Sequence, residues 1–390
     1  MSSPSVPTAL AADLGRDAPT LRLAGHVLAM FAFDVGLRID LEVAAGRVEG
    51  AARPRFIRGR RRAPVWFDED PAPLHLVVAG EPVTVHGDVR TEADASVTLH
   101  AFGGATVTYR LPLPPDETGL PVLTAALHEH AVLEADARRR LEQLVGGLGP
   151  AIERPAIDAA VEDYVVVCIT GWEPAADGSV LPRTAAEFLE TRRALVARTI
   201  EAETGALSAE QVERSTAARM SYGPDDLAVV DWNAAVLVDP EPDDVVAVLQ
   251  HANLELLELR ILDQTLDRII ASADEALDTL MVRRLWPAFA ERRLLGEVAG
   301  AQSDAAVGFE GLHNAIKLVG TQYLARLHRL AAEQLGLPEW EAGVRRKLEA
   351  GEALYAKMSD TAGTRRLEIL EWVIIILIAI SIVLPFTPAY

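Results

Sequence analysis

The chain has 390 residues, half of them hydrophobic, which is enough for two domains or for one domain with a long extension. Its formal net charge of -20 excludes a protein that coats nucleic acid through a broad basic surface, although it permits a local basic patch. The single cysteine, Cys168, excludes an intrachain disulfide and a metal site built from several cysteines, and it indicates a reducing compartment. We therefore expect the bulk of the chain in the cytoplasm.

The first 20 residues have no apolar run behind a basic region, so they predict a disordered lead without a secretory signal. From Leu21 the alternating and β-branched residues predict two strands, Arg22 to Phe33 and Val35 to Val43. Asp34 and Gly36 lie between them. We therefore expect the two strands to form a hairpin.

Six arginines without an acidic residue follow, with Trp66 and Phe67 shortly after them. The guanidinium group binds phosphate or carboxylate in a bidentate manner, and the aromatic rings are suited to stacking on bases or lying at a lipid interface. The alternative is a solvated loop whose arginines pair with the protein's own carboxylates. The candidate phosphate or lipid contacts are Arg53, Arg55, Arg58, Arg60, Arg61 and Arg62.

Glycine and proline separate several short strand-like runs, which predict one mostly antiparallel sheet. These runs are Leu74 to Val78, Val83 to His86, Ser96 to Ala101 and Ala105 to Leu111. Helical spacing from Pro121 to Leu144 predicts a helix packed on this sheet. Val165 to Ile169 is continuously apolar and predicts a buried central strand, so Cys168 within it is not a reactive thiol.

Two apolar runs, Leu227 to Val230 and Ala234 to Val238, predict a hairpin around Trp232. A helix then begins near Pro242, and a heptad pattern continues from Val245 to Leu280, on the order of 50 Å. Because that length exceeds the needs of a compact domain, we expect this helix to pack against helices of its own chain or of a partner. The candidate oligomer seam comprises Leu249, Leu256, Leu259, Asp263, Leu266 and Ile270.

Asp263 is the one charged residue at an a position of this heptad pattern. A polar residue there costs stability and fixes register or oligomer number, and a charge persists in the seam only if it is paired or hydrated. Arg260 and Arg268 are the nearest cations in the sequence. The alternative is that the helix bends away from its partner and leaves Asp263 in solvent.

A second long helix is predicted from Phe309 to Leu330 and a third from Trp340 to Met358, with Gly363 separating the third helix from the C-terminal tail.

The tail, residues 365–386, predicts a transmembrane anchor, because no residue from Trp372 to Phe386 is charged and Arg365 and Arg366 precede this stretch on the cytoplasmic side. The alternative is a helix buried in an oligomer core. The candidate membrane residues are Trp372, Ile374, Ile375, Ile376, Leu377, Ile378 and Leu384.

Catalytic signatures are missing from the sequence: it contains neither a phosphate-binding P-loop nor a nucleophile elbow. His128 and His130 would lie roughly 200° apart on a helix and cannot share a metal ion there. We interpret His251, His313 and His328 on the long helices as packing or surface residues. The sequence therefore predicts no catalytic residue, cofactor or metal, and a protein that is not an enzyme.

Together these patterns predict an α+β fold. It begins with a mostly antiparallel sheet with packed helices and continues with long antiparallel or coiled-coil-like helices and a C-terminal membrane helix. The expected parts are the disordered lead at 1–20, an α+β domain at 21–240, a long-helix region at 241–362 and the membrane tail at 365–386.

The stretch from Arg366 through Leu-Glu-Ile-Leu-Glu-Trp to Ile378, with the Trp232 hairpin and the segment from Leu256 to Asp263, resembles the required-for-meiotic-nuclear-division family. The resemblance extends over the chain from Tyr164, and Ser381 replaces an acidic residue of the family pattern. It implies a membrane-anchored protein with an α+β domain, long helices and no established catalytic residues. Mitochondrial members of that family support translation at the inner membrane.

Our functional expectation is a membrane-tethered, self-associating scaffold without catalytic chemistry, a homo-oligomer that crosses the cell membrane once. One alternative is a membrane adaptor that binds RNA or ribosomes in support of translation, which would use the arginine cluster. The other is an enzyme with an unrecognised site.

Overall fold

The computed structural model of the protein describes residues 21–48, 72–174, 181–282, 296, 299–301, 303–310 and 322–383. The chain divides into two compact units. Unit 1 combines Met1–Leu259 with Gly311–Glu339, and unit 2 combines Arg260–Glu310 with Trp340–Tyr390. Unit 1 is therefore discontinuous in sequence, with residues 260–310 inserted into it.

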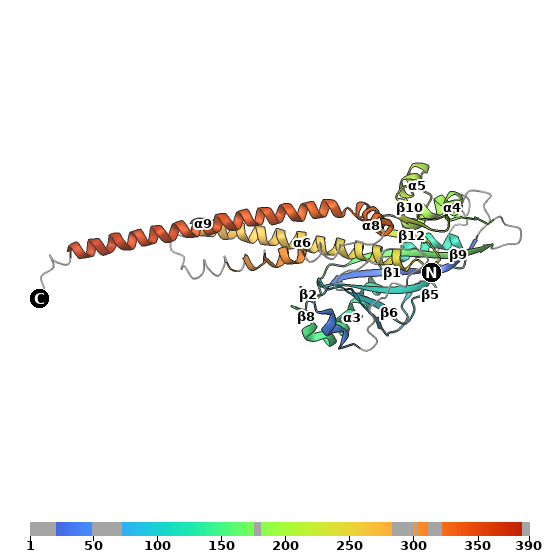
Figure 1. Cartoon of the computed structure of the whole chain (residues 1–390), viewed down its shortest axis with the longest axis horizontal. Coiled ribbons are helices and arrows are strands. Elements are labelled where there is room, and N and C mark those ends of the chain that lie inside the picture. Colours follow the sequence, from blue (N-terminus) through green and yellow to red (C-terminus); the bar gives the residue numbers. More distant parts are fainter. Residues whose placement is uncertain are drawn as a thin grey trace, which may run out of the picture. The chain divides into compact units, whose positions relative to one another are not determined.

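Unit 1 is built on an eight-stranded sheet with the strand order β10-β11-β12-β9-β1-β7-β6-β3 (Figure 1). The pair β12 and β9 is parallel and the other neighbours are antiparallel, so the sheet is mixed rather than purely antiparallel. The strands are β1 Leu21–Asp34, β3 Leu74–Val78, β6 Ala95–Leu99, β7 Gly104–Pro112, β9 Glu162–Pro174, β10 Arg219–Met220, β11 Leu227–Val230 and β12 Ala234–Val238. Two small pairs lie beside it: β2 Arg38–Ile39 with β8 Ile152–Glu153, and β4 Thr84–His86 with β5 Val89–Arg90.

Strand β1 lies in the interior of this sheet and pairs antiparallel with both β7 and β9. Alternate residues such as Ala29, Phe31 and Phe33 belong to a core shared with the helices α2 (Leu120–Leu127), α3 (Ala131–Leu148) and α4 (Ala185–Ile200). Met30, which lies between them, is buried outside that core. Both faces of β1 are therefore covered from Val27 to Phe33, which explains the continuous apolar sequence of this part. Figure 1 shows α3 and the first part of α6 (Asp243–Val282) on opposite sides of β1.

The expected hairpin at the start of the chain is wrong. Strand β1 extends as predicted, but its partners come from later in the chain. The segment that follows forms helix α1, Leu41–Ala45, because the Asp40 side chain accepts hydrogen bonds from the backbone N–H groups of Glu42 and Val43. An Asp at this position stabilises a helix start and thereby overrides the strand propensity of the segment.

Strand β9 confirms the predicted buried central strand. It lies between β1 and β12, and Cys168 within it is fully buried. Burial raises the pKa of the Cys168 thiol to about 12, so the thiolate that reacts as a nucleophile is suppressed. The predicted hairpin around Trp232 is also confirmed, because β11 pairs with β12 across this turn.

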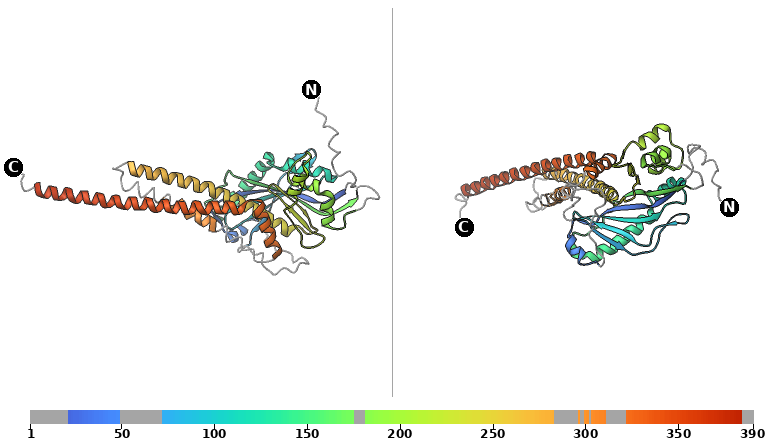
Figure 2. Two further views of the ribbon diagram at one scale, coloured as in Figure 1. Left: turned by 90° about the horizontal axis from the view of Figure 1, so that it is seen from above. Right: turned by 45° about the vertical axis from the view of Figure 1, so that its right-hand side comes forward.

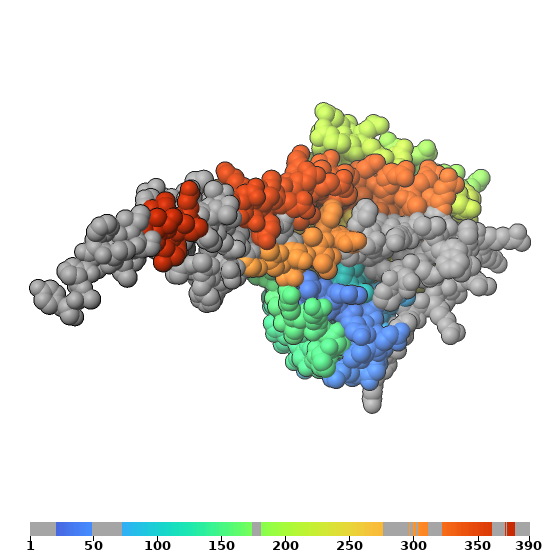
Figure 3. All heavy atoms as spheres, turned by 60° about the vertical axis from the view of Figure 1, so that its left-hand side comes forward, coloured from blue at the N-terminus to red at the C-terminus, as the bar shows by residue number. Residues whose placement is uncertain are grey.

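Several shorter helices of unit 1 pack around the sheet. They are α2 Leu120–Leu127, α3 Ala131–Leu148, α4 Ala185–Ile200, α5 Ala209–Ser215 and α8 Gln322–Gln334, with short 3-10 turns η2 Glu117–Gly119 and η3 Gly149–Ala151. Figure 2 shows α4 and α5 together at the β10–β12 end of the sheet. Figure 3 shows the blue residues around α1 beside the green residues that end α3, where α1 contacts η3.

The single helix predicted from Pro121 to Leu144 is two helices. Helix α2 ends at Leu127, and Glu129 has a positive φ of 51°, which is incompatible with a continuing helix. Helix α3 begins after His130, whose ring accepts a hydrogen bond from the Leu133 N–H. This break has a local cause, a histidine cap, that spacing of apolar residues does not reveal.

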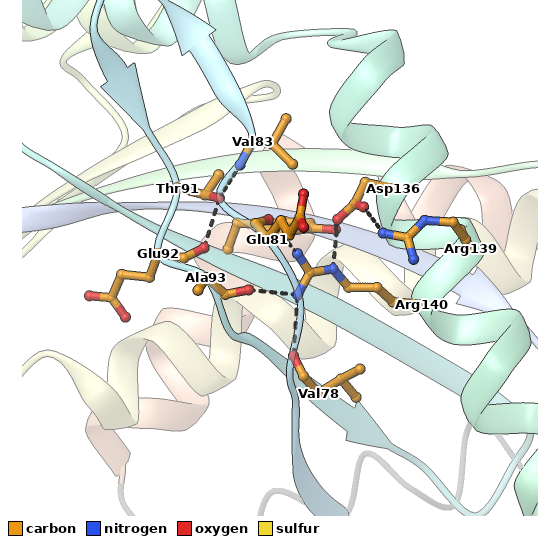
Figure 4. A network of polar contacts seen from close by, with 10 residues as sticks. Val78, Glu81, Val83, Thr91, Glu92, Ala93, Asp136, Arg139 and Arg140 are labelled. Carbon is orange, nitrogen blue, oxygen red and sulfur yellow. Dashed lines mark hydrogen bonds and ion pairs between the residues drawn. The ribbon is translucent and has the colours of Figure 1, made fainter.

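Arg140 on α3 connects this helix to the β3–β6 part of the sheet (Figure 4). Its side chain is 1% exposed, and its guanidinium donates hydrogen bonds to the Asp136 carboxylate and to the carbonyl oxygens of Val78, Glu81 and Ala93. A Cβ at Gly80 would lie 2.3 Å from the guanidinium carbon, so any larger residue there would displace the Arg140 guanidinium from its acceptors. The buried cation thus donates four hydrogen bonds, which offset its desolvation.

Two long helices each have residues in both units: α6, Asp243–Val282, and α9, Leu337–Val383. The predicted start of α6 after Pro242 is confirmed. Gly363, expected to separate two helices, lies inside the continuous α9. In unit 2 both helices run in the same direction (Figures 1 and 2), so the antiparallel arrangement expected for the long helices does not hold for this pair.

The predicted transmembrane tail anchor is wrong. No helix among the described residues is long and apolar enough to cross a membrane, which also removes the basis for a single-pass cell-membrane protein. The uncharged stretch of α9 runs only from Trp372 to Val383. A span of about 17 residues that ended at Val383 would begin at Leu367 and include the carboxylates of Glu368 and Glu371.

We predict that Arg140→Met destabilises unit 1 by about 3–5 kcal/mol, because three buried backbone carbonyl groups lose their donor and the Asp136 carboxylate loses one of its donors. Arg139→Met is the matched control. The Arg139 side chain also pairs with Asp136 but is 54% exposed. The control should cost less than about 1 kcal/mol. Urea unfolding of both variants measures the difference, and equal losses would contradict the central role of Arg140.

Candidate functional site

The arginine cluster from Arg53 to Arg62 lies outside the described residues. Its role in binding phosphate, lipid or RNA therefore stays a prediction.

The predicted oligomer seam lies along α6, and the single chain already buries most of its apolar members. Leu249, Leu256, Leu259 and Leu266 are each at most 2% exposed, and Ile270 is half-buried. The fold of one chain is therefore enough to account for the heptad pattern in its first half. Assembly through this seam stays a prediction.

Asp263 lies within unit 2 and has a cation as its partner. The Lys347 Nζ on α9 is 2.7 Å from a carboxylate oxygen of Asp263 and 2.7 Å from one of Asp267. Burial works to lower the pKa of Lys347, but hydrogen bonds and charge from the two aspartates raise it overall. The partner of Asp263 thus comes from 84 residues later in the chain, not from Arg260 or Arg268, the nearest cations in sequence.

The end of α9 exposes a continuous apolar segment. The six side chains from Val373 to Ile378 are between 49% and 60% exposed. The Trp372 side chain and Leu384 lie outside the described residues. We call Val373 to Ile378 the apolar segment of α9.

His128 and His130 have separate structural roles. The His128 ring nitrogen Nδ1 lies 3.3 Å from a carboxylate oxygen of Asp163, whereas His130 caps α3. The two histidines lie at the break between α2 and α3 rather than along one helix, which the sequence argument had assumed.

A different group of side chains meets inside unit 1, and the sequence interpretation missed it. His251 and Glu255 lie on α6 and His328 on α8, and one ligand atom from each lies within 4.8 Å of the others. The His328 Nε2 is 3.1 Å from the Glu255 carboxylate. His251 and Glu255 are 6% and 8% exposed, so this cluster, which we call the His–Glu cluster, is largely removed from water.

Aromatic rings from the β6–β7 connection pack against the His–Glu cluster. The buried His100 ring lies 5.8 Å from the His251 ring between centroids, and Phe102 meets His251 edge to face at 6.3 Å. On the other side the ring of His328 is 6.0 Å from that of His251. These contacts restrict the orientation of the His251 imidazole.

Helix α8 is held beside α6 by contacts within unit 1. The Tyr323 hydroxyl lies 3.2 Å from the Asp226 carboxylate, and its ring meets Tyr222 edge to face. Leu327, next to His328, is fully buried. The third member of the His–Glu cluster therefore comes from a firmly packed helix.

Three carboxylates face one another where β1 ends. Burial, with the charge of Asp158, raises the pKa of Asp34 to about 6, although the Gly36 N–H lowers it. Burial and the charges of Asp34 and Asp158 raise the pKa of Glu258 well above its usual range. Mutual repulsion of this kind favours protonation of at least part of the group near neutral pH.

The fold defines the class of this protein: an α+β domain, closed from two stretches of chain around a mixed sheet, which continues into long helices. Residues 24–244 match the family described as "Uncharacterized protein MJ0711, N-terminal domain". This match covers more than half of the 390 residues, and the chain belongs to that family.

A relative in Methanocaldococcus jannaschii, the uncharacterized protein MJ0711, is 20% identical over 202 residues. The aligned part is 50% of this chain and 60% of that relative, so the chain spans less than two thirds of the relative's length. No solved structure matches the chain. The resemblance to the required-for-meiotic-nuclear-division family stays a prediction.

We predict that Asp34→Asn stabilises the protein above pH 6 by about 2 kcal/mol and leaves it unchanged near pH 4. The pKa of Asp34 is raised from 3.8 to about 6, so the folded state favours the neutral acid. Its stabilising contribution is complete below pH 3.8 and is lost as the pH rises through about 6. Asparagine stays neutral and avoids that loss.

Thermal melts of Asp34→Asn between pH 4 and pH 8 measure this effect. Asp88→Asn, at the exposed β4–β5 turn, is the control and should not change the profile. Equal melting temperatures of wild type and Asp34→Asn at pH 8 would contradict the prediction.

We predict that Lys347→Met lowers stability by roughly 1 kcal/mol, because two carboxylates four residues apart on α6 lose their shared cation. Arg345→Met removes an exposed pair with Glu341 and should cost less than about 0.5 kcal/mol. Thermal melts compare the two variants. Light scattering adds a second test of Asp263, whose partner is Lys347. A different oligomer mass for Lys347→Met and wild type would support the predicted role of Asp263 in the oligomer seam.

Proposed function

We propose that the protein is a self-associating scaffold that assembles through the apolar segment of α9. The supporting observation is the exposure of six consecutive apolar side chains, Val373 to Ile378. Successive residues of a helix are about 100° apart, so six of them go more than once round its axis. A helix that is apolar on every side belongs in a hydrophobic core.

The free energy available from this segment is large enough for association. Complete burial of one large aliphatic side chain contributes about 1.5–3 kcal/mol. Because these six side chains are about half exposed, covering the rest contributes on the order of 5 kcal/mol or more for each copy. Summed over several copies, this free energy would offset the translational and rotational freedom lost on association.

A second copy of this chain is the occupant that fits the segment. All six side chains stay between 49% and 60% exposed in the single chain. An identical helix supplies an apolar segment of the same length and chemistry, and symmetric association covers all copies at once. The sequence interpretation considered this arrangement as a helix buried in an oligomer core.

An adaptor for RNA or ribosomes is the second candidate, favoured by six arginines without an acidic residue between Arg53 and Arg62. Contact with phosphate would release counterions and make binding weaken steeply with salt. An RNA-binding titration at several salt concentrations distinguishes this role from self-association, which does not require RNA.

The test of self-association replaces Ile375, Ile376 and Leu377 by glutamine, which keeps helix propensity while removing apolar surface. Wild type should give a multiple of the 42.0 kDa chain mass in light scattering, and the triple variant should give a single chain. Val132→Gln, at a residue of α3 that is 64% exposed, should leave the mass unchanged. A monomeric wild type, or a triple variant that keeps its oligomer mass, would refute the proposal.

A further inference from the structure

We propose that the His–Glu cluster binds a divalent transition-metal ion such as Zn²⁺, with His251, Glu255 and His328 as its protein ligands. This inference concerns unit 1 and does not depend on self-association through α9. It is carried by the convergence of two imidazoles and one carboxylate in a largely buried place.

The backbone positions two of the three ligands without any tertiary contact. His251 and Glu255 are four residues apart on α6, so their side chains lie on the same face of the helix. His328 approaches this face from α8, with its Nε2 3.1 Å from Glu255. Two ligands from one helix and a third from another is an arrangement familiar from zinc sites with three protein ligands.

The spacing of the ligand atoms suits a small tetrahedral ion. Zinc binds imidazole nitrogen and carboxylate oxygen at about 2.0–2.2 Å, which places neighbouring ligand atoms roughly 3.3 Å apart. The Glu255 and His328 atoms already lie at this spacing, and the atom of His251 lies within 4.8 Å of both. Binding of the ion would bring the His251 nitrogen to the same spacing.

The ligand types select the kind of ion. Mg²⁺ and Ca²⁺ prefer sites made of oxygen atoms, whereas imidazole nitrogen suits Zn²⁺ and its neighbours in the first transition row. Two nitrogens and one oxygen therefore favour Zn²⁺, Co²⁺ or Ni²⁺. A tetrahedral ion held by three protein ligands keeps one position for water or for a further ligand.

The residues around the His–Glu cluster hold its side chains in place, as expected for a binding site. His100 and Phe102 pack against the His251 ring and restrict its orientation, as neighbouring groups commonly do around metal ligands. An ion pair between His328 and Glu255 is the competing explanation for the 3.1 Å contact. That explanation concerns two of the three residues.

A metal ion at this place would connect the two stretches of chain that form unit 1. Glu255 lies near the end of the first stretch and His328 lies in the second, 73 residues later. Closing so long a loop by an ion stabilises the folded domain, because the unfolded chain lacks a preformed site. Metal binding should therefore appear as thermal stabilisation as well as in direct titration.

The experiment uses the full chain, stripped of metal with a chelator and titrated with ZnCl₂ by calorimetry. We expect one Zn²⁺ per chain and a melting temperature raised by about 5 °C or more at saturating metal. Glu255→Gln keeps the shape of the side chain and should weaken binding about 100-fold, and His251→Asn should do the same. His86→Gln, at an exposed histidine of β4, is the control and should bind like wild type.

Substitution by Co²⁺ gives a second readout on the unaltered chain. A visible ligand-field spectrum of a four-coordinate ion is expected in wild type and in His86→Gln, but not in Glu255→Gln. Absence of stoichiometric binding in wild type would overturn the proposal and leave the ion pair as the explanation. Binding that is unchanged in Glu255→Gln and His251→Asn, or lost only in His86→Gln, would also overturn it.

Discussion

The structure depends most on the double pairing of β1. This strand joins the β7-β6-β3 part of the sheet to the β9-β12-β11-β10 part, so every other strand of that sheet takes its place from it. Its geometry is constrained at Gly25, where a Cβ would lie 2.0 Å from the carbonyl oxygen of Cys168 and where φ is +141°. From Val27 to Phe33 every side chain of β1 is buried, so this part of the strand has no solvent-facing side.

Local patterns in the sequence identified much of this fold. The β11–β12 hairpin, the buried strand around Cys168 and the start of α6 after Pro242 are all set by neighbouring residues, and each was predicted. The partners of β1 were not predictable in this way, because β7 and β9 pair with it from roughly 80 and 140 residues later. Helix α1 was missed because a single Asp cap outweighs the β-branched character of the segment.

For the candidate sites too, the sequence indicates residues that are close together on one helix but not contacts between residues far apart in the chain. The spacing of His251 and Glu255 on a predicted helix was visible in the sequence, and an i, i+4 His–Glu pair is a signal that could have been followed. Nothing in the spacing indicates that His328 faces them, because the intervening chain forms part of another unit. Lys347 was equally hidden: its proximity to Asp263 arises only when α9 lies along α6. The membrane prediction for the tail was wrong because the uncharged stretch is too short by itself, and the predicted span had to include the carboxylates of Glu368 and Glu371.

The discontinuity of unit 1 has a consequence for synthesis on the ribosome. When Leu259 has emerged, the domain still lacks α8, which ends at Gln334, and the unit closes only at Glu339. At about 5–20 residues per second, the intervening 80 residues (339 − 259) take on the order of 4–16 s. During that interval α8 does not yet cover the face of α6 that carries His251 and Glu255. A nascent chain of this design spends seconds with this face of α6 uncovered, although every residue of the main hydrophobic core, from Leu21 to Val238, has already been synthesised.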